Sequence, residues 1–142
     1  MRLPRPEPGL VVCYNYLWRH ERDHGADEGR KSRPCLVLSV ERLADGRQRV
    51  LVCAITHAAP RPDAFVVEVP PRVARAIALD DDRHWIVLDE VNRFAWPGYD
   101  LRPAGKAQGG AYGFIPPLLF DRCRRAFLAA FDAARLRAVD RS

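Results

Sequence analysis

The sequence predicts a mainly β fold with α-helices, arranged as a small β-barrel with helical cover. Short runs rich in β-branched, aromatic and other apolar residues alternate with turn-forming segments along most of the chain. One long segment, which begins at Pro116-Pro117, carries apolar residues at helical spacing. The length of 142 residues suits one hydrophobic core, so we expect a single domain over residues 1–142.

The first part of the chain is expected to combine one strand with a long loop. Residues 1–8 are rich in proline and predict an extended lead-in. Residues 9–18 (GLVVCYNYLW) predict a strand with Val12 and the aromatic residues at positions 14, 16 and 18 on one face. Residues 19–33 are polar and lack apolar periodicity, which predicts a long charged loop.

A β-hairpin is expected next. Residues 34–40 form a nearly continuous apolar run, and residues 49–56 (RVLVCAIT) form a second one. The Asp45-Gly46 pair between them is a turn signal. A loop with two prolines over residues 57–63 follows the hairpin.

The middle of the chain predicts further short strands around one short helix. Residues 64–69 alternate as a strand, and Pro70-Pro71 begins a helix that continues to Leu79. The acidic run at residues 80–82 ends that helix. Residues 84–88 predict a strand, and residues 91–96 predict its continuation or a neighbouring strand.

The last part of the chain predicts a loop over residues 103–110, a short strand over 111–115 and the long helix. The expected apolar stripe of this helix, which should pack on the barrel, comprises Phe120, Cys123, Phe127, Ala130, Phe131 and Ala134. Residues 138–142 are expected to form a frayed tail.

Composition permits nucleic-acid binding without identifying a site. The net charge is +5, and Lys31 and Lys106 are the only lysines, so arginine carries nearly all the positive charge. Arginine suits phosphate because its planar fork donates two hydrogen bonds. Net charge alone reports a general binding tendency.

The cysteines and the N-terminus point to the cytoplasm. The four cysteines are widely spaced without a C-x-x-C pair, so we expect reduced, buried thiols and no zinc knuckle. No apolar run reaches the roughly 20 residues of a membrane helix, and the start lacks the apolar core of a signal peptide. We expect no membrane association.

No motif in the sequence predicts a site for a metal or a cofactor. His20 and His24 would share one face only on a helix, whereas Gly25 and the flanking charges favour a loop. The acidic run at 80–82 lacks the glycine and glutamate spacing of a calcium loop. Phosphate-binding loops and dinucleotide fingerprints are absent from the sequence.

Three ordered segments resemble the PemK/MazF-type toxins. Residues 29–38 (GRKSRPCLVL) are similar to that family's G-x-x-RP-x-x-VL signature, and residues 52–57 (VCAITH) resemble its next strand, which ends in a P-I-T-S-like tetrapeptide. Residues 89–96 (DEVNRFAW) resemble a third family segment. With the final helix, the resemblance covers roughly residues 8–132. The predicted first strand departs from the family's usual G-D-I-x-x-V-D-F-type pattern, so cleavage specificity is not carried over.

The resemblance implies an SH3-like barrel of the CcdB/PemK type, a homodimer and an endoribonuclease that a cognate antitoxin silences. It places Arg33 at the position of the family's catalytic arginine and Thr56 at that of its catalytic threonine. Such enzymes cleave single-stranded RNA without a metal or other cofactor, through attack by the substrate's own 2′-OH, and leave a 2′,3′-cyclic phosphate.

This chemistry needs a base, a positive charge on the phosphate and an acid. Arg33 suits the phosphate, and Thr56, the chain's only threonine, offers a hydroxyl donor. Glu28 and His57 are the candidates for proton transfer. The alternative interpretations are a solvated charge at a strand edge for Arg33 and a turn hydrogen bond for Thr56.

The predicted charged loop and the tryptophan before it offer candidate RNA contacts. Positive charge beside an aromatic ring on which a base can stack is typical of proteins that bind single-stranded RNA. The candidates are Trp18, Arg19, His20, Arg30 and Lys31. Nearby acidic residues nearly cancel this charge, so a solvated surface loop is the alternative. Two other functions stay open: a catalytically silent module that binds RNA or a peptide, and a CcdB-like poison of a protein target such as gyrase.

Overall fold

The computed structural model describes residues 2–26, 29, 31–105 and 109–141. Within them the chain forms nine strands and three helices. In chain order these are β1 (Leu10–Tyr14), α1 (Arg19–Asp23), β2 (Arg33–Arg42), β3 (Gln48–Thr56), β4 (Val66–Glu68), α2 (Pro71–Ala76), β5 (Trp85–Val87), β6 (Glu90–Ala95), β7 (Leu101–Arg102), β8 (Gly113–Phe114), α3 (Pro117–Asp132) and β9 (Arg137–Asp140).

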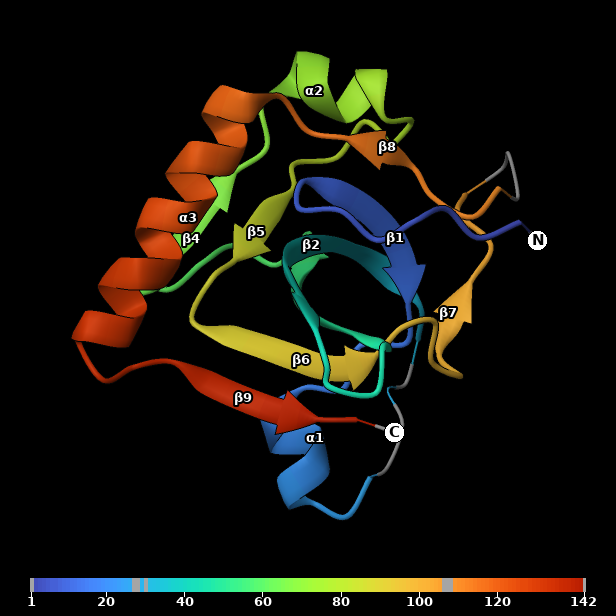
Figure 1. Cartoon of the computed structure of the whole chain (residues 1–142). Helices are drawn as coiled ribbons and strands as arrows, with labels where there is room; N and C mark the ends of the chain where they lie inside the picture. Colours follow the sequence, from blue (N-terminus) through green and yellow to red (C-terminus); the bar gives the residue numbers. More distant parts are fainter. Residues whose placement is uncertain (1, 27–28, 30, 106–108, 142) are drawn as a thin grey trace.

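The strands form one strongly curved sheet that wraps into an open barrel (Figure 1). Its hydrogen-bonded path runs β4-β5-β3-β2-β1-β7, while β6 pairs with β3 and β9, and β8 pairs with β1. Among the described residues no ladder joins β4 to β7, so the barrel is not closed. The predicted small barrel with a short internal helix and a C-terminal helix is confirmed.

The β2–β3 hairpin forms the centre of the sheet, as predicted from its two apolar runs. Its turn contains Gly46 at φ 87°, a conformation that favours glycine, and the Arg47 amide donates to Asp45 Oδ1 at 3.0 Å. Besides β2, strand β3 has two further partners: its first half pairs with β6, and its end pairs with β5. This divergence of β5 from β6 brings the end of β3 to the edge of a pocket.

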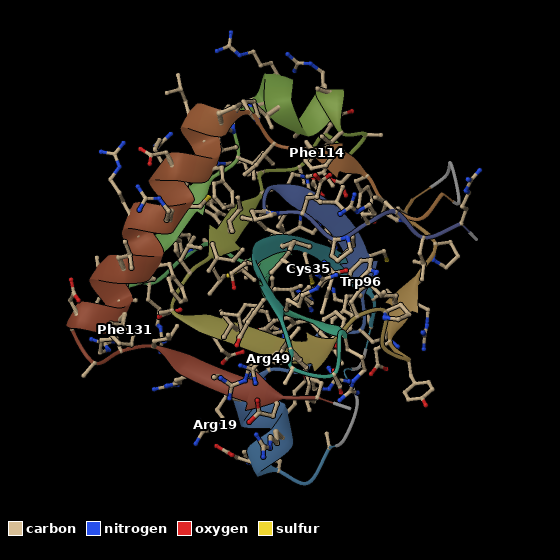
Figure 2. All side chains as sticks on the ribbon, in the orientation of Figure 1. Arg19, Cys35, Arg49, Trp96, Phe114 and Phe131 are labelled. Atoms are coloured by element: carbon tan, nitrogen blue, oxygen red, sulfur yellow. The ribbon has the colours of Figure 1, made fainter. Side chains whose placement is uncertain are left out.

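The central strands are buried on both faces, which explains their nearly continuous apolar sequences. Along β2 the side chains alternate between two cores: Leu36 and Leu38 join one cluster, and Cys35 and Val37 join the other. The first cluster lies toward α2 and α3, and the second is built around the aromatic residues of β1 and β6 (Figure 2). All four cysteines are free and buried, as expected.

Helix α3 packs by one face, but its predicted stripe ends earlier than expected. Leu119, Cys123 and Ala130 are buried, whereas Phe131 is 63% exposed. Since Ala130 points to the core, the next residue is rotated by about 100° away from it. Ala134 lies beyond the helix with a positive φ and is also exposed, so neither residue belongs to the core stripe.

The segment predicted as one long loop over residues 19–33 begins instead with helix α1. The Glu21 carboxylate accepts a hydrogen bond from the Trp18 amide at 3.1 Å and so satisfies a backbone donor at the helix start. This local cap outweighs the lack of apolar periodicity. The strand predicted over residues 9–18 correspondingly ends at Tyr14, although Tyr16 and Trp18 still pack on the same cluster as Tyr14.

The tail predicted to fray from residue 138 is instead part of strand β9. It pairs in parallel with β6, with Val139 beside Asn92, and Val139 is fully buried. The crossover through α3 gives the long connection that a parallel pair needs. The Arg141 guanidinium then anchors the end of the chain at Asp100, 2.8 Å away. Among the helices of the described ranges, none is long and apolar enough to span a bilayer.

Candidate active site

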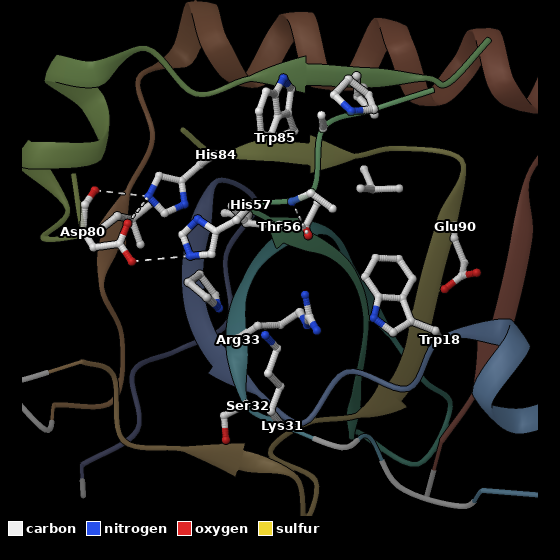
Figure 3. Close-up of a pocket in the computed structure, with 18 of the residues that line it drawn as sticks. Trp18, Lys31, Ser32, Arg33, Thr56, His57, Asp80, His84, Trp85 and Glu90 are labelled. Atoms are coloured by element: carbon white, nitrogen blue, oxygen red, sulfur yellow. Dashed lines mark hydrogen bonds and ion pairs between the residues drawn. The ribbon is translucent and has the colours of Figure 1, made fainter. Parts of the chain in front are cut away.

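A pocket of about 1350 Å³ opens where β2 begins and β3 ends (Figure 3). Arg33 is the first residue of β2, and Thr56 is the last residue of β3. Cys35 of β2 pairs with Ala54 of β3, two residues away from each of these ends. Both side chains line the pocket. The hairpin therefore brings a guanidinium and a hydroxyl together from positions 23 residues apart in sequence.

The Arg33 guanidinium lies near the middle of the pocket in Figure 3. Its Cζ lies 5.2 Å from the centroid of the Trp18 ring, a cation–π contact that holds the charge in place. Its Nε is buried without a hydrogen-bond partner in the described part of the chain. No carboxylate among the described residues forms an ion pair with Arg33. A bound anion would therefore meet a cation that is positioned but not neutralised.

Thr56 makes the turn hydrogen bond that was its alternative interpretation. Its Oγ1 accepts from the Ala58 amide at 3.1 Å. Among the described residues no acceptor for the hydroxyl hydrogen is found, so the hydroxyl can still donate toward the pocket. The turn contact orients this hydroxyl without using its hydrogen.

His57 lies at one end of the pocket, beside a second histidine (Figure 3). Its Nδ1 is 3.2 Å from the Arg83 carbonyl, and its Nε2 is 3.4 Å from Asp80 Oδ2. The two imidazole centroids of His57 and His84 are 4.6 Å apart. His84 Nε2 lies 3.0 Å from the other carboxylate oxygen, Asp80 Oδ1. The His57 ring is thus engaged at both nitrogens.

The structure places the predicted RNA contacts unequally. Trp18, His20 and Lys31 line the pocket, with the Trp18 and His20 rings 6.3 Å apart. Arg19 is not among the lining residues, and its side chain pairs instead with Asp23 on the next turn of α1. Two further predicted site residues, Glu28 and Arg30, lie outside the described residues.

Glu90 is a pocket residue that the sequence reasoning did not single out. Its carboxylate accepts from the Tyr16 hydroxyl at 2.9 Å and from the Arg19 amide at 3.3 Å. Burial raises the pKa of this carboxyl above its usual range, although the two donors oppose the shift. In the sequence, Glu90 belongs to the acidic pair Asp89-Glu90, which begins the third segment that resembles the family. A buried carboxyl with a raised pKa is a further candidate for proton transfer.

His84 and Asp80 were also missed as pocket residues. The acidic run at 80–82 was interpreted as the end of the short helix, and His84 as the start of a strand. The helix in fact ends at Ala76 and β5 begins at Trp85, so both bounds differ from the prediction. The acidic run lies in the connection between them, where the Asp82 amide donates to Asp80 Oδ1 at 3.0 Å. These interpretations could not reveal the tertiary contact with His57, which depends on the pairing of β3 with β5.

The charges around the pocket are mixed rather than uniformly positive. The lining contains the cations Lys31, Arg33, Arg61, Arg135 and Arg137 and the acidic residues Asp80, Asp81, Asp89 and Glu90. Arg135 is paired with Asp63 at 3.2 Å. A phosphate is therefore best accommodated at Arg33, away from the acidic end beside His57. The arrangement offers a phosphodiester a fixed cation, a hydroxyl donor and titratable groups nearby.

Comparisons with known proteins identify a family and a structure of similar fold. A family model described as the PemK-like, MazF-like toxin of type II toxin–antitoxin systems matches residues 16–105, which include Arg33, Thr56 and His57. No curated protein sequence matches the chain. A solved structure of a mycobacterial endoribonuclease in complex with its cognate antitoxin superposes with a TM-score of 0.57 over 89% of this chain and 95% of that one. At 16% identity this likeness concerns the fold alone.

Proposed function

The chain belongs to the PemK-like, MazF-like toxin family of type II toxin–antitoxin systems, and from this premise we propose that it is an endoribonuclease that cleaves single-stranded RNA without a metal. The observation that carries the proposal is the convergence of Arg33 and Thr56 on one pocket from adjacent strands. The mycobacterial structure of the same fold is itself an endoribonuclease.

The proposed reaction uses the substrate's own 2′-OH as nucleophile. The 2′-oxygen attacks phosphorus while a base takes its proton, and the P–O5′ bond breaks while an acid protonates the leaving oxygen. The products are a 2′,3′-cyclic phosphate and a 5′-OH. Arg33 would donate two hydrogen bonds to the non-bridging oxygens as their charge grows, and Thr56 would add a third.

Proton transfer is assigned to a small set of candidates. Glu28 and His57 follow from the sequence, and burial of the Glu90 carboxyl adds a third. His57 would act from Nε2, which requires the imidazole to leave Asp80 when substrate binds. Glu90 would act after release of one of its two donors.

RNA binding would rest on stacking beside the fixed charge. The Trp18 ring, already in contact with Arg33, offers a face for an unpaired base, with His20 and Lys31 beside it. Arg19 and Arg30 stay predicted contacts for the bound RNA. We also propose that residues 1–142 form one domain that acts on mRNA in the cytoplasm.

We further propose a cognate antitoxin and a homodimer as the partners of this chain. The mycobacterial endoribonuclease of the same fold is bound to its cognate antitoxin. An antitoxin segment that places acidic and apolar side chains at Arg33 and Trp18 would block the pocket and silence the enzyme.

A cleavage assay in EDTA tests the proposal. Purified protein is incubated with a long single-stranded RNA, and the fragment ends are analysed. Discrete fragments with cyclic-phosphate ends support the proposal. Binding without cleavage would indicate a silent module, and growth arrest with intact RNA and a DNA-topology defect would indicate a protein target; either result overturns it.

A further inference from the structure

His57, Asp80 and His84 form a cluster of potential metal ligands at the end of the pocket. Each offers one ligand atom, and these three atoms lie within 4.8 Å of one another. We propose that this cluster binds a divalent transition-metal ion of the zinc type. The three residues come from separate segments: the residue after β3, the connection after α2, and the residue before β5.

The distances within the cluster suit a tetrahedral ion. Asp80 Oδ2 lies 3.4 Å from His57 Nε2, and Asp80 Oδ1 lies 3.0 Å from His84 Nε2. Ligand atoms at about 2.0–2.1 Å from a tetrahedral zinc ion are separated from each other by about 3.3 Å. These two separations are close to those between neighbouring ligands of a tetrahedral zinc ion.

The surrounding hydrogen bonds prepare the ligands for a metal. His57 Nδ1 lies 3.2 Å from the Arg83 carbonyl, so Nδ1 can donate to this carbonyl while Nε2 binds an ion. The Asp82 amide donates to Asp80 Oδ1 at 3.0 Å and orients the carboxylate. His84 is 4% exposed, so packing fixes its ring.

Local charge favours a cation at this end of the pocket. Asp80, Asp81 and Asp82 follow one another in the turn beside the cluster. The neighbouring arginine, Arg83, points away from them, because it forms two hydrogen bonds with Glu68 at 2.8 and 3.0 Å. The acidic turn is thus not neutralised by Arg83.

The donor set selects the class of ion. Two imidazoles and one carboxylate suit zinc and related transition metals, whereas magnesium and calcium prefer oxygen ligands. His57 and Asp80 are both about half exposed and line the pocket, so a fourth position would face the pocket and take water or a substrate oxygen. Figure 3 shows the three side chains converging at the opposite side of Arg33 from Trp18.

This site goes beyond the proposed cleavage reaction, which uses no metal. An ion at the cluster would occupy His57 Nε2, the atom that His57 would use for proton transfer. Metal binding and proton transfer by His57 would therefore exclude each other. The two proposals can fail separately, because metal binding is measured without RNA.

Isothermal titration of chelator-treated protein with zinc chloride tests the proposal. We expect one zinc per chain, with the affinity reduced at least about tenfold in His57→Ala and in Asp80→Asn. Asp132→Asn and His24→Ala are the matched controls, since they remove the same chemical groups away from the pocket, and we expect both to bind as the wild type does. Circular dichroism confirms that each variant is folded.

A cobalt titration reports which atoms bind the ion. We expect the absorption of a tetrahedral nitrogen and oxygen site, without the charge-transfer band of a cysteine thiolate. The proposal is overturned if wild-type protein takes up no zinc, if His57→Ala binds zinc as tightly as wild type, or if the cobalt spectrum shows sulfur ligation.

Discussion

The guanidinium carbon of Arg33 lies 5.2 Å from the centroid of the Trp18 indole ring. This contact joins the first residue of β2 to the residue before α1, and Figure 3 shows the Arg33 side chain near the middle of the pocket. Arg33 lines the pocket, and within the described part of the chain its Nε has no hydrogen-bond partner. A cation held in place before substrate binds loses little entropy on binding.

Arg33→Ala is expected to lower the single-turnover rate of RNA cleavage by about 10²–10³-fold, the range seen when a transition-state hydrogen-bond donor is removed. Arg33→Lys should restore only part of the rate, because an ammonium group cannot donate as a planar fork. Arg42→Ala, at the exposed opposite end of β2, is the matched control and should cleave normally. Full activity of Arg33→Ala would remove this residue from the mechanism.

Thr56→Val is expected to reduce cleavage more than Thr56→Ser. Valine keeps the shape of threonine but lacks the hydroxyl, whereas serine retains both the donor and the acceptor for the Ala58 amide. We expect a loss of about 10-fold or more for valine, which is the value of roughly one charge-assisted hydrogen bond. Equal rates for the two variants would show that the hydroxyl only closes the turn.

Arg141→Met is expected to destabilise the fold by about 3–5 kcal/mol, because it leaves the Asp100 carboxylate buried without its partner. The two side chains are only 3% and 16% exposed. Arg93→Ala removes an exposed ion pair with Asp140 and should cost about 1 kcal/mol or less. Denaturant unfolding measures both. Similar small losses for the two variants would contradict the anchoring role of the chain end.

The four cysteines are expected to resist alkylation in the folded protein. Burial raises the pKa of each thiol above its usual range, so almost no thiolate forms near neutral pH. A colorimetric thiol reagent should label no cysteine rapidly in the native protein and all four cysteines in denaturant. Rapid labelling of Cys53, which is fully buried, would contradict the described core.

Glu90→Gln is expected to become more stable relative to the wild type as pH rises. Burial raises the pKa of the Glu90 carboxyl from its ordinary 4.5, so the folded chain binds this proton more tightly than the unfolded chain. The wild type therefore loses stability at Glu90 as pH rises from about 4.5 through the folded pKa, and glutamine removes that loss. Unfolding free energies from pH 4 to 8 check the trend, and a stability difference that falls with pH would contradict it.

The strands of this fold could be predicted because burial on both faces of β1, β2 and β3 leaves uninterrupted apolar runs. Sequence reasoning missed β9, which depends on contacts distant in sequence, and helix α1, which depends on a local cap. The sequence of β9 resembles a polar tail because Val139 is the one residue of this strand that is fully buried. Its pairing with β6 requires the crossover through α3. Helix α1 depends on the cap from Glu21 rather than on an apolar face.

Part of the candidate site could be predicted from the family resemblance, which singled out Arg33 and Thr56. Both line one pocket, because they lie at the ends of two strands that pair as a hairpin. His84 and Glu90 lie beside β5 and β6, which pair with different parts of β3 and so diverge from each other. No local pattern encodes that divergence, and so neither residue could be assigned to the pocket in advance.

A double-mutant cycle on single-turnover cleavage tests most directly whether Arg33 and Thr56 act on the same phosphodiester. If they do, the loss in Arg33→Ala/Thr56→Val will be smaller than the product of the two single losses by about tenfold, because each group depends on the other for its alignment. A cycle that pairs Thr56→Val with Arg42→Ala should show no such coupling. Losses that simply multiply in the Arg33–Thr56 cycle would contradict a shared phosphate.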